Sequence, residues 1–158
     1  MKASVVYRIT AVLLLLFAAG HTFGFNQVDP KWGVDSIVTS MASQRFEISG
    51  FRRTFWDFYL AAGYMVSVFY VFAAVLAWQL GGLPRETLAR MRLLTWSFAI
   101  AFAAVVELAW THLFLVPILF SSVITVCLIA AAWLSSAARD LHRSPPPTIF
   151  KSRSCARS

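Results

Sequence analysis

Charged side chains are scarce in this chain, and their scarcity excludes most soluble folds. Only 13% of the 158 residues are Asp, Glu, Lys or Arg, whereas 59% are hydrophobic and the mean hydropathy is +0.68. A soluble domain carries about 25% charged residues. Because so few charges cannot coat a globule of this size, lipid must solvate much of the surface. The composition therefore predicts an integral membrane protein with a single domain.

Residues that hold disulfides or metals are also few. Cys127 lies in an apolar run and Cys155 lies near the C-terminus, which argues against a disulfide framework. No His-x-x-x-His pair, Gly-rich phosphate loop or Gly-x-Ser-x-Gly motif is present. We therefore expect no metal site and no cofactor. The net charge of +7 is interpreted as membrane topology rather than as nucleic-acid binding.

Four apolar runs are long enough to span a bilayer, which takes about 20 residues. The predicted spans cover about 7–25, 55–80, 93–111 and 117–136. The expected fold is an all-α integral membrane four-helix bundle over residues 1–138. A basic, disordered cytoplasmic tail is expected over 139–158.

A polar extracytoplasmic segment joins the first two spans. Asp35 is expected to cap a short helix in which Ile37, Val38 and Met41 share a face. Such a helix would lie on the membrane surface. Phe46 and Ile48 then alternate with polar residues before the second span.

The positions of Lys and Arg predict the orientation. If both termini are cytoplasmic, ten of the 14 basic residues face the cytoplasm and four face outward. The positive-inside rule favours this arrangement, which would make the chain a multi-pass protein of the cell inner membrane. A cleaved signal peptide ending near Ala18-Ala19-Gly20 is the alternative for the first span, and the mass of the purified protein distinguishes the two.

Glu107 is the most unusual residue, because it lies inside an apolar run. A buried charge in hydrocarbon usually faces a bundle interior and often marks a function. By helical rise, Glu107 lies about 22 Å from Arg92 and His21 lies about 20 Å from Arg8. The similar depth predicts that His21 and Glu107 meet, either as an acid/base or ligand-polarising pair or as a structural clasp between helices.

Two further polar residues, Asp57 and His112, lie at the same outer end. Thr54 and Asp57 have the spacing of a capping box, which favours a structural role for Asp57. His112 is expected at the membrane interface. We keep His21, Glu107, Asp57 and His112 as ligand-binding candidates, with no catalytic residue assigned.

The first span contains the element Gly20-His21-Thr22-x-Gly24. With the outer segment and the three later spans, it resembles a family of small uncharacterised bacterial inner-membrane proteins. The resemblance extends to about residue 136 and implies four spans. That family has no assigned activity, so the resemblance implies no site.

Four functions are compatible with these features. The leading hypothesis is binding of a membrane lipid or a small hydrophobic molecule in an outward-opening cavity, at His21 and Glu107. The alternatives are an intramembrane acid/base enzyme, such as an isomerase of an apolar substrate, and an accessory membrane subunit. A haem held by His21 and His112 is a minor alternative, since their depths differ by about 10 Å on helical rise.

Overall fold

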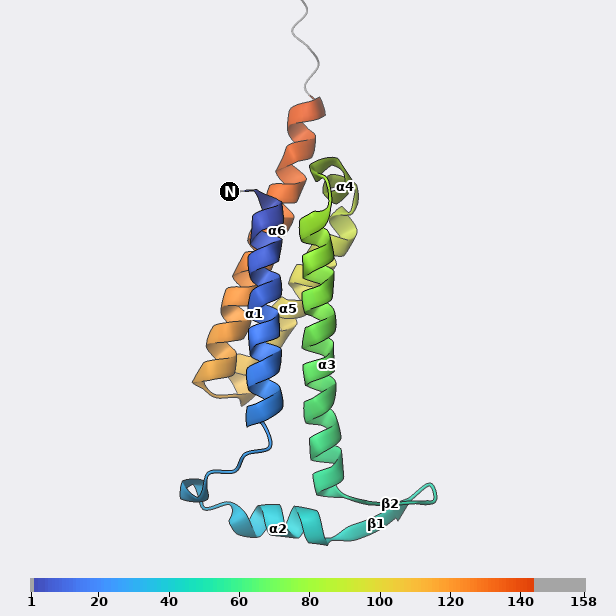
Figure 1. The fold of residues 1–158 in the computed structure, drawn as a ribbon, viewed down its shortest axis with the longest axis vertical. Coiled ribbons are helices and arrows are strands. Elements are labelled where there is room, and N and C mark those ends of the chain that lie inside the picture. The colour runs from blue at the N-terminus through green and yellow to red at the C-terminus, as the bar shows by residue number, and fades with distance from the viewer. Residues whose placement is uncertain (1, 144–158) are drawn as a thin grey trace, which may run out of the picture.

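The computed structural model describes residues 2–143, and their side chains as far as residue 136. Four of the described helices are long and apolar enough to cross a membrane, which confirms the predicted all-α four-helix bundle (Figure 1). They are α1 (Ala3–Gly24), α3 (Phe55–Gly82), α5 (Arg92–His112) and α6 (Leu115–Arg143).

The first and the last membrane-spanning helices extend beyond their expected boundaries. Helix α1 begins at Ala3, so Arg8 lies within its second turn. The Arg8 guanidinium carbon lies 3.7 Å from the centroid of the Trp78 ring on α3, and this cation–π contact accommodates the charge near the start of α1. Helix α6 extends to Arg143, into the segment that we expected to be a tail. The rest of that expected tail, 144–158, lies outside the described residues.

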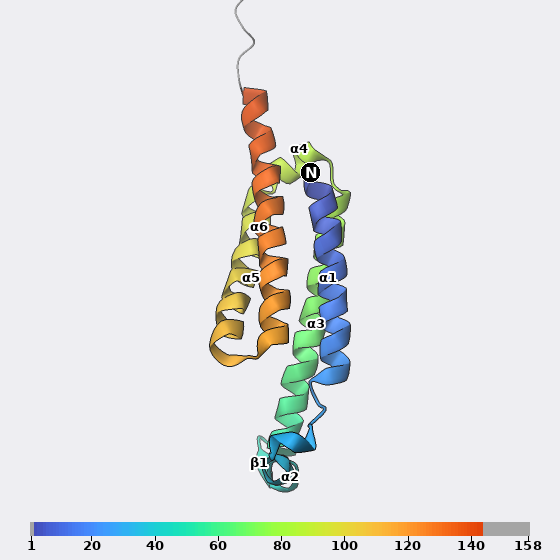
Figure 2. The same cartoon turned by 90° about the vertical axis from the view of Figure 1, so that its left-hand side faces the viewer.

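The long helices pack in the spatial order α3, α1, α6, α5 (Figures 1 and 2). Helix α1 packs along both α3 and α6, and α6 packs along α5. Helices α3 and α5 meet mainly through aromatic rings, with Phe102 of α5 lying 6.4 Å from Phe69 and 5.6 Å from Tyr70, measured between ring centroids. The α1–α3 pair is therefore joined to α5 less tightly than to α6.

Small residues allow α1 and α3 to approach closely. Six alanines of these two helices belong to the core cluster and are at most 3% exposed, namely Ala3, Ala11 and Ala18 of α1 and Ala73, Ala74 and Ala77 of α3. Where the start of α1 meets the end of α3, a Cβ added to Gly81 would lie 3.0 Å from the backbone oxygen of Ser4. Close approach matters because lipid is as apolar as a side chain, so packing contacts drive helix association.

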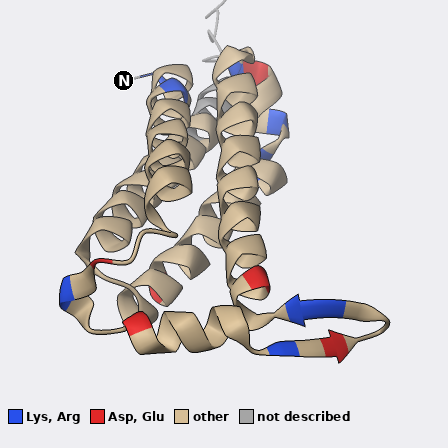
Figure 3. Cartoon of the chain, turned by 60° about the horizontal axis from the view of Figure 1, so that its bottom comes forward, with Lys and Arg blue, Asp and Glu red and all other residues tan. Residues whose placement is uncertain are grey.

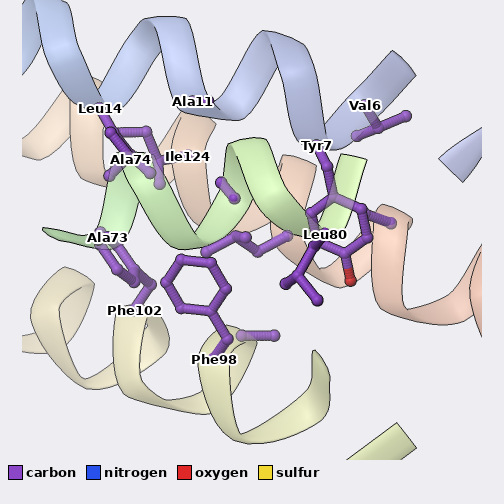
Figure 4. Close-up of a cluster of buried hydrophobic side chains, with 14 of the residues drawn as sticks. Val6, Tyr7, Ala11, Leu14, Ala73, Ala74, Leu80, Phe98, Phe102 and Ile124 are labelled. Atoms are coloured by element: carbon purple, nitrogen blue, oxygen red, sulfur yellow. The ribbon is translucent and has the colours of Figure 1, made fainter. Parts of the chain in front are cut away.

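Larger side chains fill the centre of the bundle (Figure 4). Tyr7, Leu14 and Phe102 are completely buried. Phe102 also makes an edge contact with Phe98, at 5.5 Å between centroids. The Thr125 hydroxyl of α6 donates to the Phe102 carbonyl at 3.0 Å and so ties α6 to α5.

The segment between α1 and α3 forms a layer beneath the bundle, roughly perpendicular to the helices (Figure 1). It contains a 3₁₀ turn η1 (Pro30–Trp32), helix α2 (Asp35–Ser43) and an antiparallel hairpin of β1 (Arg45–Ile48) and β2 (Phe51–Thr54). The predicted short helix is confirmed, although Val34 rather than Asp35 occupies its N-cap position. At the opposite end of the bundle, the short helix α4 (Arg85–Arg90) links α3 to α5 and packs on α6.

Candidate functional site

His21 is held between two helices at the end of the bundle where α1 leads into the α1–α3 connection. It lies in the last turn of α1, and its Nδ1 is 3.1 Å from the Ser67 hydroxyl on α3. Ser67 is buried and His21 is half-buried. The hydrogen bond crosses the α1–α3 interface, so it fixes the imidazole relative to both helices.

Aromatic rings cover both faces of the imidazole. Phe17 and Phe25 lie one helical turn before and after His21, with ring centroids 5.8 Å and 5.1 Å from its own. The Phe25 ring is nearly parallel to the imidazole, at 8°. This column of three rings restricts His21 to one orientation, with an edge rather than a face available to other molecules.

Helix α3 holds Phe25 in place. The ring lies directly on Gly63, where an added Cβ would stand only 2.1 Å from the Phe25 Cε2 atom. The Tyr59 hydroxyl donates to the Phe25 carbonyl at 2.7 Å, which satisfies a backbone group at the end of α1. Glycine at position 63 is therefore required by the packing of the ring column.

Glu107 does not join this site. Its side chain is exposed, and no described group forms an ion pair or hydrogen bond with its carboxylate. The buried face of α5 contains Phe98, Phe102 and Ala109. Glu107 lies five residues after Phe102, which is about 140° around a helix. The expected His21–Glu107 pair does not form, because α5 directs Glu107 away from the bundle.

An exposed carboxylate at this position is tolerable because the end of α5 is near. His112 ends the helix five residues later, so Glu107 lies about 8 Å from the end by helical rise. A charge near a helix end is less costly than one at the bilayer centre. The Thr111 hydroxyl donates to the Glu107 backbone carbonyl, not to its carboxylate.

Asp57 caps α3, as its spacing predicts. Its Oδ2 atom accepts from the Thr54 backbone N–H at 2.8 Å and from the Thr54 hydroxyl at 3.0 Å. The Asp57 N–H in turn donates to the Thr54 hydroxyl at 3.1 Å. This reciprocal arrangement is a capping box, so the carboxylate is occupied by the helix start.

His112 is exposed in the last turn of α5, as expected for an interfacial residue. It lies on a helix that does not pack along α1, so the structure does not bring it together with His21. Within residues 2–136, no three His, Cys, Asp or Glu side chains gather where they would hold a metal ion.

Ser67 is the residue that sequence reasoning missed. It is a polar residue inside an apolar run and lies four residues after Gly63, so the pair marks one face of α3. That pattern is the available signal for the helix face that meets His21. An open hollow of about 300 Å³ lies elsewhere, between α2 and the start of α3, and is lined by Ser36, Ile37, Ser40, Met41, Gln44 and Phe55.

Comparison with protein-family models, with curated proteins and with solved structures gives no match for this chain. The resemblance based on the Gly-His-Thr-x-Gly element therefore stays a hypothesis. What the structure itself establishes is a bundle of four apolar helices with a restrained imidazole at one end.

Proposed function

We propose that the outer end of the α1–α3 pair binds the polar group of a membrane lipid or small hydrophobic molecule through His21. The restrained imidazole supports this proposal. Ser67 and the two phenylalanine rings hold it, and within the described residues no group is bonded to its Nε2 atom. Restraint of this kind removes part of the entropy cost of binding.

The chemistry of the ligand follows from the Ser67 hydroxyl. The Ser67 hydroxyl has a single hydrogen that it can donate. Its oxygen lies 3.5 Å from the Gly63 carbonyl oxygen, one turn earlier on α3. With that hydrogen directed to Gly63, Ser67 accepts from Nδ1–H and the imidazole Nε2 becomes an acceptor. The preferred ligand is then a hydroxyl- or amine-bearing amphiphile that donates a hydrogen bond.

Two glycines next to His21 provide room for the apolar part of such a molecule. Apart from neighbouring parts of α1 itself, no described atom lies within 4 Å of a Cβ built on Gly20 or on Gly24. An acyl chain or ring can therefore approach the α1 backbone closely beside the imidazole. This replaces the cavity between His21 and Glu107 that the sequence led us to expect.

His21→Ala is expected to weaken the retention of bound lipid by about two- to tenfold, because one hydrogen bond of about 0.5–1.5 kcal/mol is lost. Native mass spectrometry of the detergent-purified protein measures the lipid-bound fraction. His112→Ala is the matched control, since it removes an exposed imidazole from the same end of the bundle.

Ser67→Ala provides a second variant, because it releases the imidazole without removing it. It should reduce retention in the same direction as His21→Ala. If His21→Ala and Ser67→Ala both retain as much lipid as His112→Ala, His21 is not a ligand contact and the proposal fails.

An accessory subunit is the second candidate, and Glu107 favours it. The exposed carboxylate has Ala103 and Ala104 one turn earlier on α5, both exposed. Small residues beside a polar group suit close packing of a partner helix in lipid. Glu107→Gln should then reduce the mass of the native complex while leaving lipid retention unchanged. The acid/base enzyme hypothesis loses its main support, since no His21–Glu107 pair forms.

We further infer that the chain lies in an inner membrane with both termini in the cytoplasm, on the distribution of Lys and Arg. Alkaline phosphatase fused to the C-terminus is expected to be inactive. The same enzyme inserted at the hairpin turn, between Ser49 and Gly50, is expected to be active because it is exported. The reverse pattern of activities would contradict this orientation.

A further inference from the structure

The β1–β2 hairpin has one polar and one apolar face. Its register pairs Glu47 with Arg52 and Ile48 with Phe51. Because side chains alternate along a strand, directly opposed residues share a face. The polar face contains Arg45, Glu47, Arg52 and Thr54, and the apolar face contains Phe46, Ile48, Phe51 and Arg53.

Phe46 shows which way the apolar face points. Its ring lies 5.0 Å from Phe55 and 5.9 Å from Phe58, with the Phe58 ring nearly parallel to it at 9°. Phe58 lies one turn further along α3 than Phe55, toward the bundle. The apolar face is therefore directed toward the side of the hairpin from which the membrane-spanning helices rise.

The hairpin extends away from the other helices rather than over them (Figures 1 and 3). It projects sideways beyond α3, away from α1, as Figures 1 and 3 show. Near its tip, Ile48 is 50% exposed and Phe51 is 59% exposed, so neither is covered by the described chain. Apolar side chains at a hairpin tip are costly in water unless something covers them.

The length of α3 sets the height of the hairpin. Its 28 residues extend for about 42 Å, close to the 40–45 Å thickness of a bilayer with its headgroups. The hairpin joins α3 at its outer end. It is therefore held at the level of the outer headgroups.

The arginines of the hairpin complete an interfacial surface. Arg53 lies over the Phe51 ring, with its guanidinium carbon 5.3 Å from the ring centroid, and its Nη1 donates to the Arg52 carbonyl. Within the described residues, no carboxylate forms an ion pair with Arg45, Arg52 or Arg53. The nearby Asp57 carboxylate accepts from Thr54 instead. These three cations are therefore available to lipid phosphates.

We propose that the hairpin is a lateral membrane anchor that binds anionic phospholipids of the outer leaflet. Ile48 and Phe51 insert below the headgroups, and Arg52 and Arg53 bind the phosphates. This surface is separate from the His21 site, so either proposal can fail without the other.

Two neighbouring spin-label positions test the insertion. Nitroxides are attached to Ile48→Cys and, as the matched control, Glu47→Cys, in the full chain with Cys127 and Cys155 replaced by Ser. The protein is reconstituted in vesicles of phosphatidylcholine and phosphatidylglycerol. Collisions with oxygen should exceed those with a water-soluble nickel chelate at position 48, and the ratio should reverse at position 47.

A hairpin in water and a hairpin covered by another protein predict different accessibilities of the two spin labels. Equal access to the nickel chelate at both positions means that the hairpin stands clear of the membrane. Exclusion of both reagents at position 48 means that a protein, rather than lipid, covers the apolar face. Either result overturns the proposal.

The phosphate contact has its own measurement. Replacing both Arg52 and Arg53 by Gln should weaken phosphatidylglycerol binding, measured by native mass spectrometry, by about fivefold for each charge removed. Lys31→Gln is the control, because Lys31 is basic and lies in the same outer segment but outside the hairpin. An equal loss in the control, or no loss in the Arg52/Arg53 variant, contradicts phosphate binding by the hairpin.

Discussion

Replacing Phe102 by Ala should lower the free energy of unfolding by about 3–5 kcal/mol, the range for a large aromatic side chain removed from a close-packed core. Phe102 is completely buried and contacts Phe69, Tyr70 and Phe98. These rings provide most of the link between α5 and α3. The cavity left by the substitution would therefore loosen one side of the bundle.

Thermal unfolding of the purified protein in detergent measures this loss. Phe72→Ala is the matched control, because Phe72 is 63% exposed on α3 and its ring is surrounded by lipid or detergent. Phe72→Ala should change the unfolding temperature little. If the two variants are equally destabilised, the aromatic contact between α3 and α5 does not stabilise the bundle.

Replacing Ala77 by Leu should destabilise the bundle by about 1–3 kcal/mol, the usual cost of overpacking a core. Ala77 is completely buried on α3, in the region where α3 packs along α1. Three added carbon atoms would force the two helices apart. Since the His21–Ser67 hydrogen bond joins the same helices, the substitution should also reduce lipid retention.

The same substitution at an exposed alanine provides the comparison. Ala61 is exposed on α3, so Ala61→Leu should leave both the unfolding temperature and lipid retention unchanged. Lipid retention that survives Ala77→Leu despite a lower unfolding temperature would mean that His21 binds its ligand without Ser67. An unchanged unfolding temperature for Ala77→Leu would mean that the interface between α1 and α3 accommodates a larger side chain at this position.

The spans and the Thr54–Asp57 capping box are the parts of the fold that the sequence predicts well, whereas the cap of α2 lies one residue before its predicted position. Long apolar runs must form helices in lipid, because each backbone group has to be bonded within the segment. The Thr54–Asp57 capping box is equally local, since both partners lie within four residues. Neither prediction needs knowledge of which helices are neighbours.

The pairing of His21 could not be predicted in the same way. Helical rise gives the depth of Glu107, but α5 is apolar around most of its circumference, so its sequence pattern does not show which face is buried. In a soluble helix, polar residues would mark the outer face. In lipid that contrast is lost, and Ser67 rather than Glu107 proves to be the partner of the imidazole.

The difference in length between α3 and α1 should make the protein responsive to bilayer thickness. Helix α1 has 22 residues and α3 has 28, so the hairpin stands about 9 Å beyond the C-terminal end of α1 by helical rise. Hydrophobic mismatch costs only fractions of a kcal/mol per ångström, but it sorts proteins between membranes. Longer acyl chains would draw Ile48 and Phe51 deeper into the leaflet. Shorter chains would leave them among the outermost headgroups and favour a tilt of the whole bundle.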